Sequence, residues 1–198
     1  TLLQASPDLT LTVNGETINL VYPKDYLTGP STLFTDSQVS GDMVFVGYGI
    51  VAETLQHNDY KGLDVDGKVV VMLSGKPQSF PSEEGAHFAS GKEKSRYAAE
   101  RGAIGIVTVT TPRREKVRPY EKSMAYIHTP SLRWIGKDGI PGGVYPQILN
   151  TAYFSKPAAQ ILFKDAKMSL DSVYELLEKD ASPEGFALNA SIDFTKKS

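Results

Sequence analysis

The sequence has no cysteine. It therefore has no disulfide framework, no thiolate metal ligand and no thiol nucleophile. It also lacks an excess of either charge: 21 Lys and Arg stand against 23 Asp and Glu, a formal net charge of −2. A chain without a basic excess is not expected to bind nucleic acid. No apolar run is long enough for a membrane-spanning helix, so no membrane span is expected.

The 198 residues, of which 40% are hydrophobic, suffice for one domain with a core of its own. Residues Leu9 to Val21 alternate around Asn14-Gly15, a dipeptide that favours the left-handed backbone of a type I′ turn, so they predict a β-hairpin. Met43 to Val51 is expected to be a strand in which two glycines permit close backbone approach. Near the end, Phe186 to Phe194 alternates with period two and predicts a half-buried strand.

The middle of the chain predicts a β-α-β unit. Val69–Leu73 and Ile104–Val109 are short, continuously apolar runs, typical of strands buried on both faces. Between them, Ser90 and Glu93 have the spacing of a capping box, and Gly102 is placed to end the helix. A crossover helix between two such strands favours a parallel pair.

Two long polar loops, Ser74–Ala89 and Thr111–Pro130, follow the two buried strands, and a short strand is expected at Ser131–Ile135. Two further helices are expected to begin at Ser155 and Ser169. These elements together predict an α+β, β-rich fold.

Several residues could suggest a metal site. His57 and Asp59 have a His-x-Asp spacing, and nitrogen and oxygen ligands of the kind that zinc takes also occur nearby in the sequence: Glu83, Glu84, His87 and His128. All of them fall in polar, turn-like segments, whereas a catalytic ligand needs a rigid seat. We therefore expect no catalytic residue, no metal ligand and no cofactor in this chain. No serine lies in a nucleophile-elbow pattern, and no phosphate-binding loop occurs.

Three segments in this order resemble the protease-associated domain inserted in bacterial secreted zinc-dependent aminopeptidases, the group related to the transferrin receptor and glutamate carboxypeptidase. They are Val44–Ile50 (VFVGYGI), Asn58–Val71 (NDYKGLDVDGKVVV) and Lys94–Val107 (KSRYAAERGAIGIV). Ser79–Glu83 and Pro130–Trp134 are also similar to that subgroup. The resemblance covers roughly residues 9 to 194.

The resemblance implies a β-sandwich or open barrel-like sheet flanked by short helices. It also implies that residues 1–198 are a single non-catalytic domain excised from a larger secreted, periplasmic or cell-envelope peptidase. Zinc is then expected only in the catalytic domain of the parent protein. The implied partners are that catalytic domain and a peptide or protein substrate, with the domain covering the active-site cleft or restricting access to it. A plain spacer is the simpler alternative.

If the two buried strands are parallel, both long loops leave the same edge of the sheet. Aromatic and Arg side chains are the types that most often anchor interfaces. We therefore predict a binding edge formed by Phe80, Phe88, Arg113, Arg114, Arg118, Tyr120 and Tyr126. Solvated loops without a binding role are the alternative. Two other function classes also stay open at this point: a free-standing small metallohydrolase, and an adhesion or carbohydrate-binding module.

Overall fold

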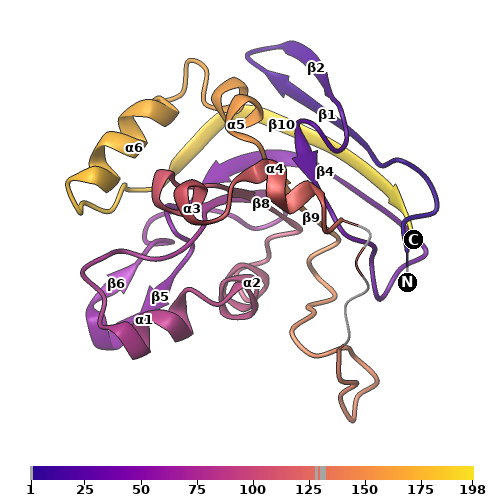
Figure 1. The fold of residues 1–198 in the computed structure, drawn as a ribbon, viewed down its shortest axis with the longest axis horizontal. Coiled ribbons are helices and arrows are strands. Elements are labelled where there is room, and N and C mark those ends of the chain that lie inside the picture. Colours follow the sequence, from indigo (N-terminus) through magenta and orange to yellow (C-terminus); the bar gives the residue numbers. More distant parts are fainter. Residues whose placement is uncertain (1, 128, 130–132) are drawn as a thin grey trace.

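An eight-stranded mixed sheet forms the centre of the structure, a computed structural model that describes residues 2–127, 129 and 133–198. The strand order is β2-β1-β10-β4-β7-β8-β9-β3, and the sheet curls until it is nearly a barrel (Figure 1). The strands are β1 (Asp8–Val13), β2 (Glu16–Leu20), β3 (Tyr26–Leu27), β4 (Asp36–Phe45), β7 (Val69–Leu73), β8 (Gly105–Val109), β9 (Asn150–Phe154) and β10 (Phe186–Lys197). A separate two-stranded sheet joins β5 (Val51–Ala52) to β6 (His57–Asn58), with a 3-10 turn at Glu53–Leu55 between them.

The amino-terminal hairpin is confirmed. Asn14 and Gly15 both have positive φ, 50° and 85°, and connect β1 to its antiparallel partner β2. On its other side, β1 pairs antiparallel with β10. The backbone amide of Gln4 donates to the carbonyl of Lys197 at 3.0 Å, so residues near the two ends of the chain lie beside each other (Figure 1).

The predicted parallel crossover is also confirmed. Strands β7 and β8 are parallel neighbours, and α2 (Gly91–Ala99) connects them. The helix ends as expected, because Gly102 has a φ of 79° and its amide donates to the carbonyl of Ala99. The parallel region extends to β4 on one side and to β9 on the other.

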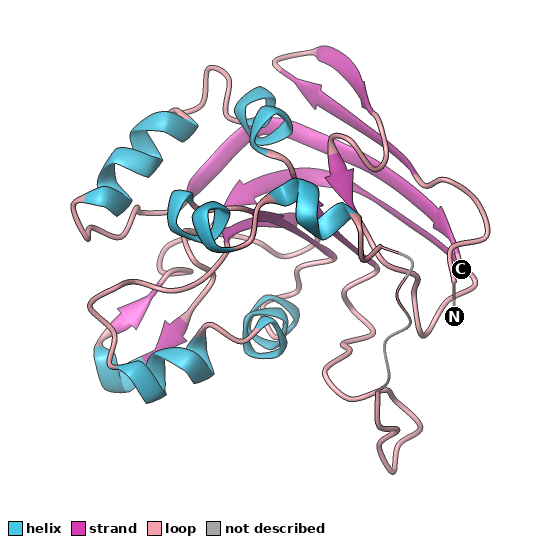
Figure 2. Cartoon of the chain, viewed as in Figure 1, coloured by secondary structure: helices cyan, strands magenta, loops and turns pink. Residues whose placement is uncertain are grey.

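Two apolar layers lie on opposite faces of this parallel centre. Successive residues of β7 alternate between them, and all five are buried. On one face, Tyr97 and Ala98 of α2 pack against Val70 and Ile106. The larger cluster includes the buried apolar residues of α5 (Lys156–Leu162) and α6 (Leu170–Glu178). Figure 2 shows the helices flanking the curled sheet. Both helices begin as predicted, since the hydroxyls of Ser155 and Ser169 accept hydrogen bonds from the backbone amides three residues later.

Asn150, the first residue of β9, joins three strands at one end of the curl. Its side-chain oxygen accepts a 2.7 Å hydrogen bond from the Ser37 hydroxyl on β4, and its amide donates at 2.8 Å to the Phe194 carbonyl on β10. A longer contact of 3.4 Å reaches the carbonyl of Ser37. Asn150 is only 2% exposed, so the protein itself must satisfy its polar atoms.

Three predictions about strands and caps are wrong. The strand expected at Met43–Val51 ends at Phe45, because the chain turns through Gly47 and Gly49, whose φ values are 56° and 69°. Ser90 makes no side-chain cap, and the Glu93 carboxylate binds Arg96 instead of closing a capping box. In the described part of Ser131–Ile135 there is only an isolated bridge, from Ile135 to Pro141; Ser131 and Leu132 lie outside the described residues.

The two long loops are not structureless. The first contains α1 (Ser82–Phe88), and the second contains α3 (Pro112–Val117) and α4 (Tyr120–Met124). Each helix starts at or just after a proline, whose fixed φ suits the first turn. None of the helices in the described ranges is both long and apolar enough to cross a membrane. The fold class is nevertheless the expected one: an α+β, β-rich architecture with short flanking helices.

Candidate functional site

The two segments that follow β7 and β8 do leave the same edge of the sheet, because these strands are parallel. The Ser74 amide donates to the carbonyl of Val109 at 2.8 Å where both strands end. Farther out, the Arg113 guanidinium donates to the side-chain oxygen of Gln78 at 2.9 Å. The two segments therefore form one connected surface.

The seven residues predicted for this edge divide into two groups. Phe80 and Tyr120 are 8% and 5% exposed, so their rings pack within the chain instead of facing a partner. Phe80 meets His57 edge-on, and Tyr120 stacks on Tyr153 and donates to the carbonyl of Pro23. The others reach the surface to different degrees: Phe88 is half-buried, whereas Arg113, Arg114, Arg118 and Tyr126 are exposed. Binding by these five stays a prediction.

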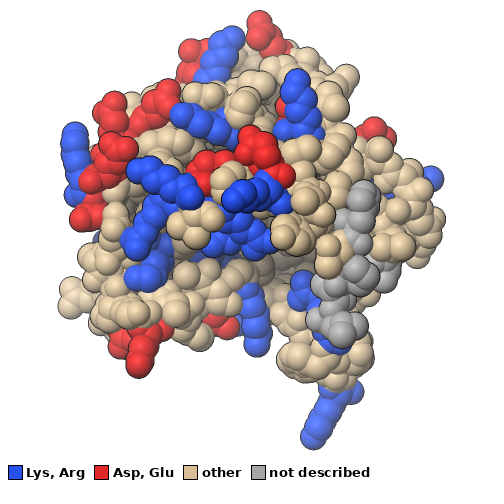
Figure 3. All heavy atoms as spheres, viewed as in Figure 1, with Lys and Arg blue, Asp and Glu red and all other residues tan. Residues whose placement is uncertain are grey.

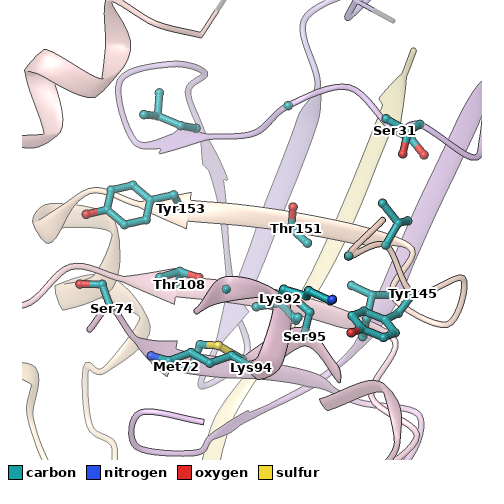
Figure 4. A pocket seen from close by; sticks show the side chains of 18 of the residues that line it. Ser31, Met72, Ser74, Lys92, Lys94, Ser95, Thr108, Tyr145, Thr151 and Tyr153 are labelled. Carbon is teal, nitrogen blue, oxygen red and sulfur yellow. The ribbon is translucent and has the colours of Figure 1, made fainter. Parts of the chain in front are cut away.

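A wide cleft of about 940 Å³ lies beside this edge, over the face of β7, β8 and β9. Its floor carries Met72, Ile106, Thr108 and Thr151, and α2 forms one wall. Figure 4 shows Lys92, Lys94 and Ser95 of α2 over this floor, with Tyr153 and Ser74 toward one end and Tyr145 toward the other. The residues around Ser31 and Val144 close the remaining sides.

The charges in the cleft have one sign. Six of its described lining residues are cationic, and none is Asp or Glu; the cations are Lys92, Lys94, Arg114, Arg118, Arg133 and Lys196. Figure 3 shows Lys and Arg side chains gathered over the region of α3, beside a small group of acidic side chains. One acidic neighbour, Glu115, does not line the cleft: its carboxylate accepts hydrogen bonds from the Thr110 hydroxyl and the Tyr120 backbone amide.

Lys94 is the most deeply buried of these cations, at 4% exposure. Its ammonium nitrogen donates to the carbonyls of Leu73 and Gly75 at 2.9 and 2.6 Å, and lies 5.6 Å from the centre of the Tyr48 ring. Burial lowers the pKa of Lys94 from 10.5 to about 7, partly opposed by the charge of Asp59. Burial likewise lowers the pKa of Lys196 to about 8, and its ammonium donates to the carbonyl of Gly29.

The lowered pKa of Lys94 predicts a pH-dependent stability. Between about pH 7 and 10.5, the unfolded chain binds a proton at Lys94 that the folded chain has released, so the free energy of unfolding should rise with pH in this window. The rise from this one group is at most about 1.4 kcal/mol per pH unit. Urea unfolding at pH 7, 8 and 9 measures it. In Lys94→Met the part of the rise that comes from Lys94 should vanish, while the part that comes from Lys196 remains. If the unfolding free energies of the two proteins rise in parallel with pH, Lys94 is not the source of the rise.

Sequence reasoning missed Lys94 and Lys196, although their positions carried a signal. Lys94 lies three and four residues before Tyr97 and Ala98, so all three share the buried face of α2. Lys196 continues the inward-facing series of β10, two residues after Phe194. Ser74 was also missed: its hydroxyl oxygen is buried without a hydrogen-bond partner at the end of β7.

The candidate metal ligands that the structure describes do not gather into one site. His57 Nε2 lies 2.9 Å from Asp59 Oδ1, without the alignment of a hydrogen bond, and Asp59 also accepts from the Ile50 amide. Glu83, Glu84 and His87 are exposed on α1, and His128 lies outside the described residues. Within the part of the chain that the structure describes, no three His, Cys, Asp or Glu side chains are grouped to hold a metal ion.

No family model and no curated protein matches this chain. Among solved structures, it is similar to an aminopeptidase from Aneurinibacillus sp. strain AM-1, with 15% identity and a TM-score of 0.40 over 99% of this chain. It is also similar to the psychrophilic subtilisin-like protease Apa1 from the Antarctic psychrotroph Pseudoalteromonas sp. AS-11, with 9% identity and a TM-score of 0.41 over 97% of this chain. The chain spans about a third of each of these structures, 34% and 33%.

Proposed function

We propose that this chain is a non-catalytic accessory domain of a peptidase, of the protease-associated kind, which contacts the catalytic domain and restricts the substrates that reach it. A secreted location, and zinc held by the parent catalytic domain, are part of the same proposal. The observation that carries it is that the three segments resembling the protease-associated domain interlock in space.

The first and second segments meet at Asp59. Its carboxylate accepts from the amide of Ile50 at 2.9 Å, and its own amide donates to the carbonyl of Ile50 at 3.0 Å. A Cβ on Gly47 would lie only 3.0 Å from the same carboxylate, so a glycine keeps this turn close. The Gly47-Tyr48-Gly49 sequence and Asp59 thus form one structural unit.

The second and third segments meet at Gly102. The Gly67 amide donates to its carbonyl at 2.9 Å, and Asp66 lies so close that Gly102 has no room for a Cβ. The Ile104 amide then donates to the carbonyl of Lys68, which starts the parallel pairing of β7 and β8. The residues behind the resemblance are therefore those that build the centre of the fold, which supports a shared architecture.

The proposed working surface is the edge after β7 and β8, with Arg113, Arg114, Arg118 and Tyr126 exposed on it. Arg and Tyr side chains anchor interfaces because they combine contact area with hydrogen bonding. If the edge restricts access, Arg113→Ala/Tyr126→Ala in the full-length peptidase should change the ratio of kcat/KM for a dipeptide to that for a decapeptide by at least about threefold. These side chains are exposed, so the fold should be unaffected.

Lys167→Ala/Lys179→Ala, which changes two exposed side chains outside this edge, is the control and should leave the ratio unchanged. An unchanged ratio in the edge variant would overturn the gating role and favour a spacer. One equivalent of tightly held zinc in the purified chain, together with peptidase turnover lost on His57→Ala, would favour a free-standing metallohydrolase instead.

A further inference from the structure

We propose that the cleft over β7, β8 and β9 binds the carboxylate groups of an extended acidic peptide. This inference goes beyond the proposed function, and it holds whether or not the chain serves a peptidase. It rests on the charges that line the cleft, and on two buried ammonium groups and a buried hydroxyl that, within residues 2–127, 129 and 133–198, have no carboxylate partner and no hydrogen-bond partner respectively.

The arrangement of the cations fits carboxylates. Arg114 lies on α3 and Arg118 directly follows that helix, and both residues line the cleft. A guanidinium presents parallel N–H donors that match the two oxygens of a carboxylate. Neither Arg is within ion-pair distance of an acidic residue among the described residues, although Arg118 lies 5.8 Å from the centre of the exposed Tyr126 ring.

The two buried lysines provide the second argument. Lys94 and Lys196 are 4% and 5% exposed, and both ammonium groups donate to backbone carbonyls rather than to carboxylates. A buried charge is costly unless it is paired. Each lysine lines the cleft, so an anionic ligand could supply the missing opposite charge. The lowered pKa of each amine would rise again when such a ligand binds.

Ser74 provides the third and independent argument. Its hydroxyl oxygen is buried without a hydrogen-bond partner, and the residue lines the cleft between the two carbonyls that bind Lys94. Buried polar atoms in folded proteins are nearly always satisfied, so this hydroxyl is available to pair with a water or with a ligand group in the cleft. A hydroxyl beside an ammonium group is suited to donate to an anionic oxygen.

The size and floor of the cleft favour a peptide over a small ion or a nucleic acid. Its volume of about 940 Å³ is near the top of the range for ligand pockets, far more than a single inorganic anion fills. The floor alternates apolar Met72 and Ile106 with the hydroxyls of Thr108 and Thr151, which suits side chains and amides. Nucleic-acid binding depends on broad basic surfaces, whereas this chain has a net charge of −2.

Fluorescence anisotropy tests the proposal on the whole chain with a labelled octapeptide that carries four Glu residues and a free C-terminus. Its Gln counterpart, which has the same length, should bind at least about tenfold more weakly, because four carboxylates are lost. An amidated version of the Glu peptide separates the terminal carboxylate from the side-chain carboxylates. If the amidated form loses affinity and the Gln peptide does not, the cleft binds only a chain terminus and the proposal of an acidic peptide is overturned. If the amidated form keeps its affinity, the side-chain carboxylates are the groups bound.

Two variants locate the site. Arg114→Gln/Arg118→Gln should weaken the Glu peptide at least about tenfold, whereas Lys167→Gln/Lys179→Gln, with the same change in net charge outside the cleft, should leave the affinity within about twofold. Ser74→Ala should weaken binding without lowering Tm, since the hydroxyl has no hydrogen-bond partner among the described residues. The proposal is overturned if the Glu and Gln peptides bind equally, if the two double variants behave alike, or if a single-stranded oligonucleotide or inorganic phosphate displaces the peptide with higher affinity.

Discussion

Asn150→Ala is expected to lower the free energy of unfolding by about 3–5 kcal/mol. The substitution removes hydrogen bonds that join β9 to β4 and β10, and it leaves buried acceptors and a buried hydroxyl without partners. Each hydrogen bond contributes about 1 kcal/mol net, and each orphaned buried group costs about 1–3 kcal/mol. A loss of this size is a large part of the stability of a typical domain.

Urea unfolding of a matched set measures this effect. Thr151→Ala changes the next residue, whose side chain is exposed, and should alter stability by less than about 0.5 kcal/mol. Ser37→Ala removes one partner of Asn150 and should cost less than the Asn150 substitution. Because the two side chains contact each other, the double variant should be less destabilised than the sum of the single variants, by about 0.5–3 kcal/mol. Additive losses would show that the two side chains do not depend on each other.

Phe45→Ala is expected to lower the free energy of unfolding by about 3–5 kcal/mol, the usual effect of truncating a fully buried aromatic ring. Phe45 is 0% exposed, and its ring centre lies 5.2 Å from those of both Phe163 and Phe186. These edge-on and tilted contacts join β10 and the residue that follows α5 to the end of β4, and each such pair adds about 0.5–1.5 kcal/mol beyond its buried area.

Phe45→Leu keeps most of the apolar volume and should cost clearly less than the alanine variant. Equilibrium unfolding of both variants by near-UV circular dichroism separates the loss of the ring from the loss of volume. If Phe45→Ala costs less than about 1.5 kcal/mol, the three rings do not form the tight cluster described above.

The parts of the fold that the sequence predicts correctly depend on local chemistry. Asn14-Gly15 allows few other conformations than a tight turn, and Ser155 and Ser169 cap their helices with their own hydroxyls. The missed strand residues 36–42 are mostly polar, since only alternate residues such as Val39 face inward at the curl of the sheet. Strand β9 was missed because Asn150 is a poor strand former that long-range hydrogen bonds place there.

The missed helices α1, α3 and α4 are short, and their surroundings hold them in place more than their intrinsic propensity does. One cap was readable: the Thr111 hydroxyl accepts from the Arg114 amide, and Pro112 occupies the first turn. The candidate site was predicted only as an edge, because the parallel strands fix that edge by topology. The cleft is lined by residues of α2, β10 and the segment around Tyr145. These residues are far apart in the chain, and no local sequence pattern predicts that they come together.

The pairing of Gln4 with Lys197 has a consequence for how this unit can be attached. Their backbones are joined by a 3.0 Å hydrogen bond, so any chain continuing past both positions would enter and leave at neighbouring points. A few glycines could join the two ends in a circular permutant, and the whole unit could be grafted into a surface turn of a host protein without spreading that turn. Attached in this way, the unit would be joined to its host at one place and would bring its cleft with it.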